Sequence, residues 1–296
     1  MSEDAWILLN SHPDRNRRTL NTLLNIFHSP EKILGANEAE LVRIPGVNRA
    51  FARTLLEMPG HFPLWEEKER MAETGARLIT VRDPGYPSNL GSMASPPPLL
   101  YVIGDFIQED RFSIAVIGSR RSTEYGRRIC RRISGGLAEN GITIVSGMAR
   151  GIDTKAHKSA LRAGGRSIAV LGSGLSRCYP PENKTLMADL SQNGAVLSEY
   201  CMTMEPRKTN FPERNGIIAG LSLGVLIVEA SRRSGSLITA RAALEENRSV
   251  YAVPGDVFHE NSEGTNALIR DGAQSVTCAG DILEDLKLVI RGMMNE

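Results

Sequence analysis

The spacing of apolar residues changes near residue 75 of the chain. Before that point they recur at helical spacing, as in the run from Leu20 to Phe27. From residue 76 onward, short uninterrupted runs of Val, Ile and Leu alternate with amphipathic segments. This pattern predicts a small helical domain over residues 1–75 and a larger α/β domain over residues 76–296.

Within the first region, the stretch LVRIPGVNRAFARTLLE from Leu41 to Glu57 places Pro45 and Gly46 between two short amphipathic segments. This pattern is typical of a helix-hairpin-helix, whose tight turn can present backbone N–H groups to a phosphate. A hairpin that serves only as scaffold in a small helical bundle has the same pattern. The sequence is compatible with both interpretations.

In the second region, six apolar runs are strand candidates, with helix candidates between them. The strands are expected at residues 113–118, 142–147, 167–172, 195–200, 225–230 and 249–255. The helices are expected near residues 123–140, 151–163, 182–192, 212–221 and 236–247. Such alternation predicts a doubly wound α/β fold whose mostly parallel sheet is covered on both faces. Proline-punctuated segments over residues 75–104 are expected to add edge strands.

Composition and charge limit the kinds of partner and cellular environment that the chain can have. The chain has 296 residues, 41% hydrophobic content and a formal net charge of +1, so any binding of nucleic acid must come from local clusters of basic residues. The four cysteines show no CxxC pair and no metal-like spacing with the five histidines, which favours reduced thiols. No apolar run approaches the length of a membrane span. We expect a cytoplasmic protein with no metal and no membrane partner.

Small and basic residues follow several of the predicted strands. In a doubly wound fold the ligand lies beyond the carboxyl ends of the strands, where glycine turns and helix N-termini suit an anion. The candidate binding residues at these positions are Gly118, Ser119, Arg120, Ser146, Gly147, Arg150, Gly151, Lys184, Arg214 and Asn215. Taken singly, each has an ordinary structural explanation, but their repetition at several strand ends predicts a phosphate site.

Motifs for catalysis or for a cofactor are missing from the sequence. The first strand of the α/β region is followed by VIGSRRS, which lacks GxGxxG, and the chain has no Walker-type GxxxxGK[ST] and no HExxH. A GxSxG elbow is also absent, and none of the five histidines has an identifiable nucleophile to activate. We therefore expect a binding protein, without a cofactor, rather than an enzyme.

A series of motifs carries a resemblance to a known family. In chain order these are AVIGSRRSTEYG, IVSGMARGIDTKAH, SIAVLGSGLSRCYPPENKTL, LSEY, FPERNGIIAGLS, VEASRRSGSLITARAALEENRSVYAVPGD and EGTNALIRDGA. Over about residues 80–285 the chain resembles the DNA-processing protein A family, known as DprA or Smf. The helical N-terminus agrees with the small SAM-like domain of that family.

The resemblance implies an extended Rossmann-like domain that binds single-stranded DNA, forms a homodimer and helps to load the RecA recombinase onto strands coated by single-strand-binding protein, notably during natural transformation. It implies no known catalysis. The GSR motif assigns Arg120 to DNA, and the SGxARGID motif adds Ser146, Gly147, Arg150 and Gly151. The YPxxNxxL motif adds Lys184, and FPxRN adds Arg214 and Asn215.

Two positions depart from the family pattern. The family usually reads FPxRNR, whereas position 216 is glycine here, which removes a basic group. Met187 stands where some relatives place an aromatic residue to stack on a base. The effect of both departures is left open, as are the dimer surface and the recombinase contact.

Two other functions are compatible with this architecture. A phosphoribohydrolase of the lysine-decarboxylase-like (LOG) group would cleave nucleoside monophosphates, with Glu199 or Glu229 as acid or base. The PGGxGT signature of that group is absent, and SGSLITA occupies the corresponding region. A dimeric adaptor without affinity for DNA is the other alternative.

Overall fold

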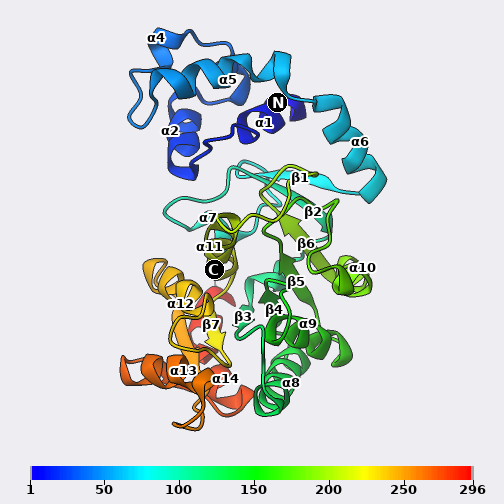
Figure 1. Ribbon diagram of the computed structural model, residues 1–296, viewed down its shortest axis with the longest axis vertical. Coiled ribbons are helices and arrows are strands. Elements are labelled where there is room, and N and C mark those ends of the chain that lie inside the picture. The colour runs from blue at the N-terminus through cyan, green and yellow to red at the C-terminus, as the bar shows by residue number, and fades with distance from the viewer. Residues whose placement is uncertain (1, 295–296) are drawn as a thin grey trace.

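The computed structural model describes residues 2–294 of the chain, and six helices precede its sheet (Figure 1). Asparagine side chains begin two of these helices, since the Asn16 carboxamide accepts from the N–H of Arg18 and the Asn48 carboxamide accepts from that of Phe51. The six helices are α1 (Glu3–Asn10), α2 (Arg17–Phe27), α3 (Pro30–Leu34), α4 (Glu38–Leu41), α5 (Arg49–His61) and α6 (Leu64–Thr74). Helices α4 and α5 flank the Pro45–Gly46 turn, as expected of the hairpin.

The described residues of the larger region form a nine-stranded sheet in the order β1-β2-β6-β5-β4-β3-β7-β8-β9. The strands from β6 to β9 in this order are parallel, while β1 and β2 add an antiparallel edge. The strands are β1 (Arg77–Thr80), β2 (Leu99–Gly104), β3 (Ser113–Ile117), β4 (Thr143–Ser146), β5 (Ser167–Val170), β6 (Gly194–Ser198), β7 (Gly224–Ile227), β8 (Ser249–Ala252) and β9 (Gln274–Ser275). The order reverses between β3 and β7, as in a doubly wound fold.

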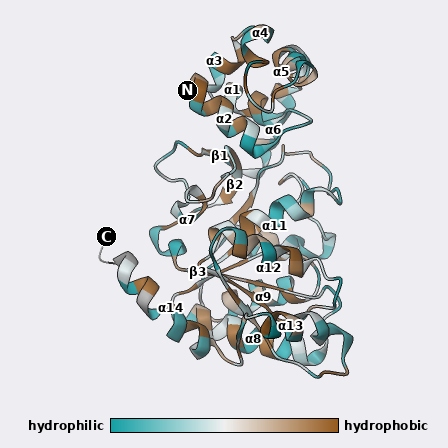
Figure 2. Ribbon diagram, turned by 90° about the vertical axis from the view of Figure 1, so that its left-hand side faces the viewer, coloured by the Kyte–Doolittle hydropathy of each residue, from teal (hydrophilic) through white to brown (hydrophobic). Residues whose placement is uncertain are grey.

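Helices cover both faces of this sheet because its strands are apolar on both sides. Ala115 and Val225 face the side covered by α11 and α12, whereas Ile114 and Leu226 face the side covered by α8, α9 and α14. The helices are α7 (Ser88–Gly91), α8 (Glu124–Glu139), α9 (Ile152–Arg162), α10 (Lys184–Gln192), α11 (Asn210–Leu221), α12 (Ser236–Glu245), α13 (Glu260–Arg270) and α14 (Ala279–Met294), with the 3-10 turns η1 (Gln108–Arg111) and η2 (Pro181–Asn183). Figure 2 shows apolar residues along the strands and hydrophilic residues on outer helix turns.

The N-terminal helices pack directly against one end of the sheet. A single hydrophobic cluster contains Leu9 and Met71 from these helices together with Tyr101 of β2 and Val196 of β6. The Glu67 carboxylate of α6 accepts a hydrogen bond from the backbone N–H of Met202 at 2.8 Å. The expected domain boundary at residue 75 falls between the end of α6 at Thr74 and the start of β1 at Arg77. It stays a prediction, because the N-terminal helices and the sheet share one hydrophobic cluster.

The predicted doubly wound, mostly parallel fold is confirmed, and all six predicted strands are present with ends shifted by a few residues. The proline-rich segment adds β1 at the edge, but β2 lies one strand further in, between β1 and β6. Helix α13 was not predicted, because its sequence ENSEGTNALIR has few apolar residues. Among the described residues, no helix combines the length and the apolar character needed to cross a membrane.

Candidate nucleic-acid interface

A cavity of about 610 Å³ opens at the carboxyl ends of β3 and β7, where the strand order reverses. Register places Ile117 of β3 beside Ile227 of β7, so the loops that follow both strands meet at the same edge. We call this space the switch-point cavity. Its lining includes Gly118, Ser119, Arg120 and Arg121 after β3, Ala149 and Asp153 after β4, Lys208, Phe211, Arg214 and Asn215 around the start of α11, and Ser231, Ser234 and Ser236 after β7.

Hydrogen bonds of Ser119 hold the loop after β3 in place, and the side chain of Arg120 in this loop is exposed to solvent. The N–H of Ser119 donates to the carbonyl of Glu229 at 2.7 Å, and its hydroxyl accepts from the N–H of Arg121 at 3.1 Å. The Arg120 guanidinium lies 5.3 Å from the ring centroid of Phe211, within the range of a cation–π contact. Among the described residues, no carboxylate forms an ion pair with Arg120.

The loop after β4 is tightly packed against its neighbours. Gly151 has a φ of +79°, and a Cβ there would lie 2.2 Å from the carbonyl oxygen of Ser119, so this position requires glycine. Met148 also has a positive φ, of 54°, although it is not glycine. The Asn183 carboxamide donates to the Met148 carbonyl at 2.9 Å and so ties η2 to this loop.

Two of the predicted site residues are buried in structural roles. The hydroxyl of Ser146 donates to the carbonyl of Val116 at 2.7 Å and joins β4 to β3. Arg214 is 4% exposed, and its Nη1 donates to the carbonyls of Gly147 and Val170 at 2.5 and 2.6 Å. A Cβ at Gly147 would lie 2.2 Å from that nitrogen, so glycine makes room for the guanidinium.

Asp153, in the first turn of α9, lies within the same cavity lining. Burial raises the pKa of its carboxyl to about 6, although the positive charge of Arg214 opposes this shift. Burial likewise lowers the pKa of the Arg214 guanidinium, and Asp153 partly compensates. These two buried groups of opposite charge both lie in the lining of the cavity.

Arg150 and Lys184 lie outside the lining of the switch-point cavity. Arg150 is 57% exposed and forms an exposed ion pair with Glu182, with an Nη2–Oε2 distance of 3.0 Å. Hydrogen bonding to Arg150 lowers the pKa of the Glu182 carboxyl. Lys184 is exposed at the first position of α10, outside the lining of the switch-point cavity. The structure therefore brings Arg120, Arg150, Arg214 and Asn215 to one edge, with Lys184 further out.

Two aromatic residues at this edge were not singled out from the sequence. Tyr179 is 41% exposed, and its ring centroid lies 6.3 Å from that of Phe211. Arg120, Tyr179 and Phe211 all line a smaller recess that adjoins the switch-point cavity. Both aromatics open motifs visible in the sequence, YPPEN and FPERN, which was the available signal. Met187, by contrast, is only partly buried and packs against the hydrophobic cluster of the N-terminal helices.

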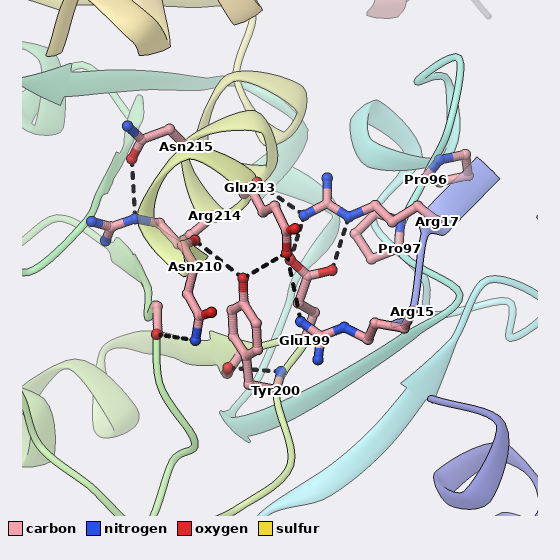
Figure 3. A network of polar contacts seen from close by, with 12 residues as sticks. Arg15, Arg17, Pro96, Pro97, Glu199, Tyr200, Asn210, Glu213, Arg214 and Asn215 are labelled. Carbon is pink, nitrogen blue, oxygen red and sulfur yellow. Dashed lines mark hydrogen bonds and ion pairs between the residues drawn. The ribbon is translucent and has the colours of Figure 1, made fainter. Parts of the chain in front are cut away.

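A polar network holds the start of α11 in place (Figure 3). The guanidinium of Arg17 in α2 donates to both carboxylate oxygens of Glu199, at 2.8 and 2.5 Å, and to the carbonyl of Glu213 at 2.9 Å. The Arg15 guanidinium lies 4.1 Å from the ring centroid of Tyr200, whose hydroxyl donates to the Glu213 carboxylate at 2.9 Å. We call Arg15, Arg17, Glu199, Tyr200 and Glu213 the junction cluster.

The junction cluster also bears on the departure at position 216. A Cβ on Gly216 would lie 3.5 Å from Nη1 of Arg17. A side chain at position 216 would thus begin next to a guanidinium supplied by α2.

The two carboxylates considered for catalysis both have structural partners. Burial would raise the pKa of Glu199, but the charge of Arg17 and its hydrogen bonds outweigh burial and lower it. The Glu229 carboxylate accepts from the N–H of Thr123 at 2.9 Å and from its hydroxyl, at the start of α8. Neither residue lines the switch-point cavity. Within residues 2–294 no cluster of His, Cys, Asp and Glu could hold a metal ion.

Comparison with known proteins identifies relatives over most of the chain. The model of a family described as DNA recombination-mediator protein A matches residues 77–287. Protein Smf of Synechocystis sp. is 36% identical over 271 residues, which are 90% of this chain and 68% of that protein. Protein Smf of Escherichia coli is 47% identical over 211 residues, which are 71% of this chain and 56% of that protein. The match thus spans little more than half of the Escherichia coli relative.

Two solved structures share the fold. The crystal structure of DNA processing protein A from Streptococcus pneumoniae aligns with a TM-score of 0.83 at 34% identity, covering 96% of this chain and 98% of that one. DNA processing protein A from Helicobacter pylori, described for its single-stranded DNA binding mode, aligns with a TM-score of 0.64 at 32% identity, covering 71% of this chain and 95% of that one. The resemblance seen in the motifs is confirmed: the chain belongs to the DNA recombination-mediator protein A family, whose members include DprA and Smf.

Proposed function

We propose that the chain binds single-stranded DNA at the switch-point cavity and acts in DNA processing during transformation and recombination. One observation carries this proposal: Arg120 is an exposed cation next to the ring of Phe211, without a carboxylate partner among the described residues. An unpaired guanidinium suits a phosphate, and the rings of Phe211, which is partly buried, and of Tyr179, which is 41% exposed, suit a base. The Helicobacter pylori relative, which is described as binding single-stranded DNA, supports this proposal.

In this proposal the strand contacts the protein mainly through its backbone. Arg120, Arg150 and Lys184 neutralise phosphates, while Gly118, Gly147 and Gly151 permit the close packing of the turns that carry them. Tyr179 and Phe211 provide the stacking surface. Contacts to phosphates and stacking on bases carry little sequence information, which suits a protein that accepts any strand.

The partners in this proposal rest on the family resemblance. They are the RecA recombinase, which the protein would help to load, single-strand-binding protein on the DNA, and a second copy of the chain. The cytoplasmic location also stays a prediction, consistent with four cysteines that form no disulfide.

Fluorescence anisotropy of a labelled oligothymidine over a salt series tests the DNA-binding proposal. We expect wild type to bind single strands in preference to duplex and Arg120→Ala to weaken binding on every sequence. The slope of log affinity against log salt should fall by about 0.7 for each phosphate that the variant no longer neutralises. The control Lys32→Ala removes an exposed cation from α3 and should change neither quantity. Equal affinity and slope in wild type and Arg120→Ala would refute the assignment of this cavity.

The alternatives predict different outcomes. An adaptor would bind the recombinase while wild type showed no affinity for single strands. A phosphoribohydrolase would release free base from a nucleoside monophosphate. We expect no release, because Glu199 and Glu229 are both committed to structural contacts.

A further inference from the structure

A second depression, of about 680 Å³, lies beside the switch-point cavity and extends over α8 and α9. We call it the α8–α9 groove. It shares Arg120 and Arg121 with the cavity, so the two spaces are continuous around the loop after β3. Its charged lining residues are Arg120, Arg121, Arg127, Arg150, Lys155, Lys158, Arg162 and Glu182.

The charge of this groove is out of proportion to the rest of the molecule. Seven of its lining side chains are cationic and one is anionic, whereas the whole chain carries a net charge of only +1. The single carboxylate, Glu182, is already bonded to Arg150. Among the described residues, no ion pair involves Arg121, Lys155, Lys158 or Arg162. Arg127 is paired with Glu124, so five of the seven cations have no ion-pair partner among the described residues, and the groove concentrates positive charge.

The spacing on α9 adds to this argument. Lys155, Lys158 and Arg162 are three and four residues apart, so they lie on one face of the helix. Like charges at this spacing destabilise a helix when no carboxylate stands between them. At 1.5 Å per residue they extend the basic surface roughly 10 Å along α9. An anionic ligand with charges at regular intervals would offset the repulsion along this line.

We propose that the α8–α9 groove binds the phosphates of the same DNA strand beyond the switch-point cavity. This inference rests on the proposed function, because it extends the path of a strand that the cavity must first bind. The groove has no exposed aromatic residue in its lining, so it contacts the backbone and leaves the bases in solvent. The cavity with its aromatic pair and the groove with its cations are thus two successive parts of one path.

The decisive variant is Lys158→Ala/Arg162→Ala. Both side chains are exposed, and neither belongs to the switch-point cavity. The matched control is Arg18→Ala/Lys32→Ala, which removes two exposed cations, without an ion-pair partner among the described residues, from the N-terminal helices. A charge-preserving variant, Lys158→Arg/Arg162→Lys, separates loss of charge from any change in α9.

Affinity is measured on two oligothymidines over a salt series. One has about 6 nucleotides, near the lower end of known single-strand site sizes, and the other has about 35. We expect Lys158→Ala/Arg162→Ala to bind the short strand like wild type. On the long strand its affinity should fall roughly fivefold or more at low salt, with a salt slope lower by about 1.4, the value for two phosphates left without a cation. The control and the charge-preserving variant should match wild type on both strands.

Two results would overturn the inference while leaving the proposed function intact. One is unchanged affinity and slope of Lys158→Ala/Arg162→Ala on the long strand, which would assign the groove to some other anionic partner. The other is equal weakening on both strands, which would place these cations within the short site itself. If wild type bound neither strand, the proposed function would fail first, and this inference would fail with it.

Discussion

Arginine side chains have opposite surroundings in the junction cluster and in the α8–α9 groove. In the junction cluster, Arg17 is 19% exposed in its side chain and donates two hydrogen bonds to the buried carboxylate of Glu199. In the groove, Arg121 and Arg162 are exposed and have no ion-pair partner among the described residues. Both regions are rich in arginine, but the junction cluster pairs Arg17 with a buried carboxylate, whereas most cations of the groove have no ion-pair partner among the described residues.

This difference separates arginines that hold the fold from those that are free to bind a ligand. A buried guanidinium must have its charge compensated and its donors satisfied, and Arg17 obtains both from Glu199. An exposed guanidinium has no such requirement, and its unpaired donors remain available to phosphate. By this criterion Arg214 belongs with Arg17, because its donors are bonded to two backbone carbonyls.

The strongest test of the comparison is Arg17→Ala. It leaves the Glu199 carboxylate buried without its partner, which should lower the free energy of unfolding at pH 7 by about 3 kcal/mol. Urea denaturation followed by circular dichroism measures this loss. The double variant Arg17→Ala/Glu199→Gln removes the stranded charge and should recover part of it. The control Arg49→Ala removes an arginine that is 79% exposed and should leave the transition unchanged.

The same pair predicts a dependence on pH. The pKa of Glu199 is lowered from its ordinary value of 4.5, so its stabilising contribution is present above that pH and is lost as the pH falls through the lower value of the folded state. Without Arg17, burial raises the pKa of Glu199, so the difference between wild type and Arg17→Ala should begin to shrink above pH 4.5 and continue to shrink below it. A constant difference from pH 7 to pH 3 would mean that the ion pair is not its cause.

A smaller effect is expected for Arg214→Lys. The lysine keeps the positive charge, but its shorter chain draws the cation away from the carbonyls of Gly147 and Val170. It also lacks the Nε–H that donates to the Asn215 carboxamide oxygen at 3.2 Å. We expect the free energy of unfolding to fall by about 2 kcal/mol, with little change in affinity for single strands. Arg120→Lys is the matched comparison, and it should leave the unfolding transition in place. A loss of affinity without a loss of stability in Arg214→Lys would move Arg214 to the ligand-binding group.

The sheet was predictable because buried parallel strands have a simple signature. Runs such as SIAVIG and VLIVEA are apolar at nearly every position, and both faces of the sheet are covered as that pattern requires. The hydrophobic pattern is weaker where packing depends on close backbone contact. In α13, for example, a Cβ on Gly264 would lie 2.7 Å from the carbonyl of Ala230, so the helix approaches its neighbour at a glycine rather than through a large apolar side chain.

The position of the candidate site could also be predicted, but not the role of each residue in it. The rule that ligands lie beyond the carboxyl ends of strands located the edge that carries Arg120 and Arg150. Whether an arginine points to solvent or into the protein depends on partners distant in sequence. Arg214 bonds to Gly147, 67 residues away, and Arg17 bonds to Glu199, 182 residues away. No local pattern encodes those contacts.

The smallest expected effect concerns Arg150, which is exposed and also paired with a carboxylate. Arg150 is exposed like the groove cations, yet its guanidinium is bonded to the Glu182 carboxylate, which takes the place that a phosphate would need. Exposed ion pairs are weak, so DNA should displace Glu182 at a small cost. Glu182→Gln removes that competition together with one negative charge in the α8–α9 groove, and it should tighten binding of single strands about two- to threefold.

The measurement is anisotropy at low salt, where exposed charges are least screened. The control is Glu205→Gln, because Glu205 pairs with Arg177 at 3.5 Å in an exposed contact outside the lining of the groove, and this variant should leave affinity unchanged. If Glu182→Gln weakened binding instead, the ion pair would be orienting Arg150 for phosphate. Arg150 would then belong with the arginines whose position is fixed by a carboxylate, and pairing alone would no longer distinguish the two groups.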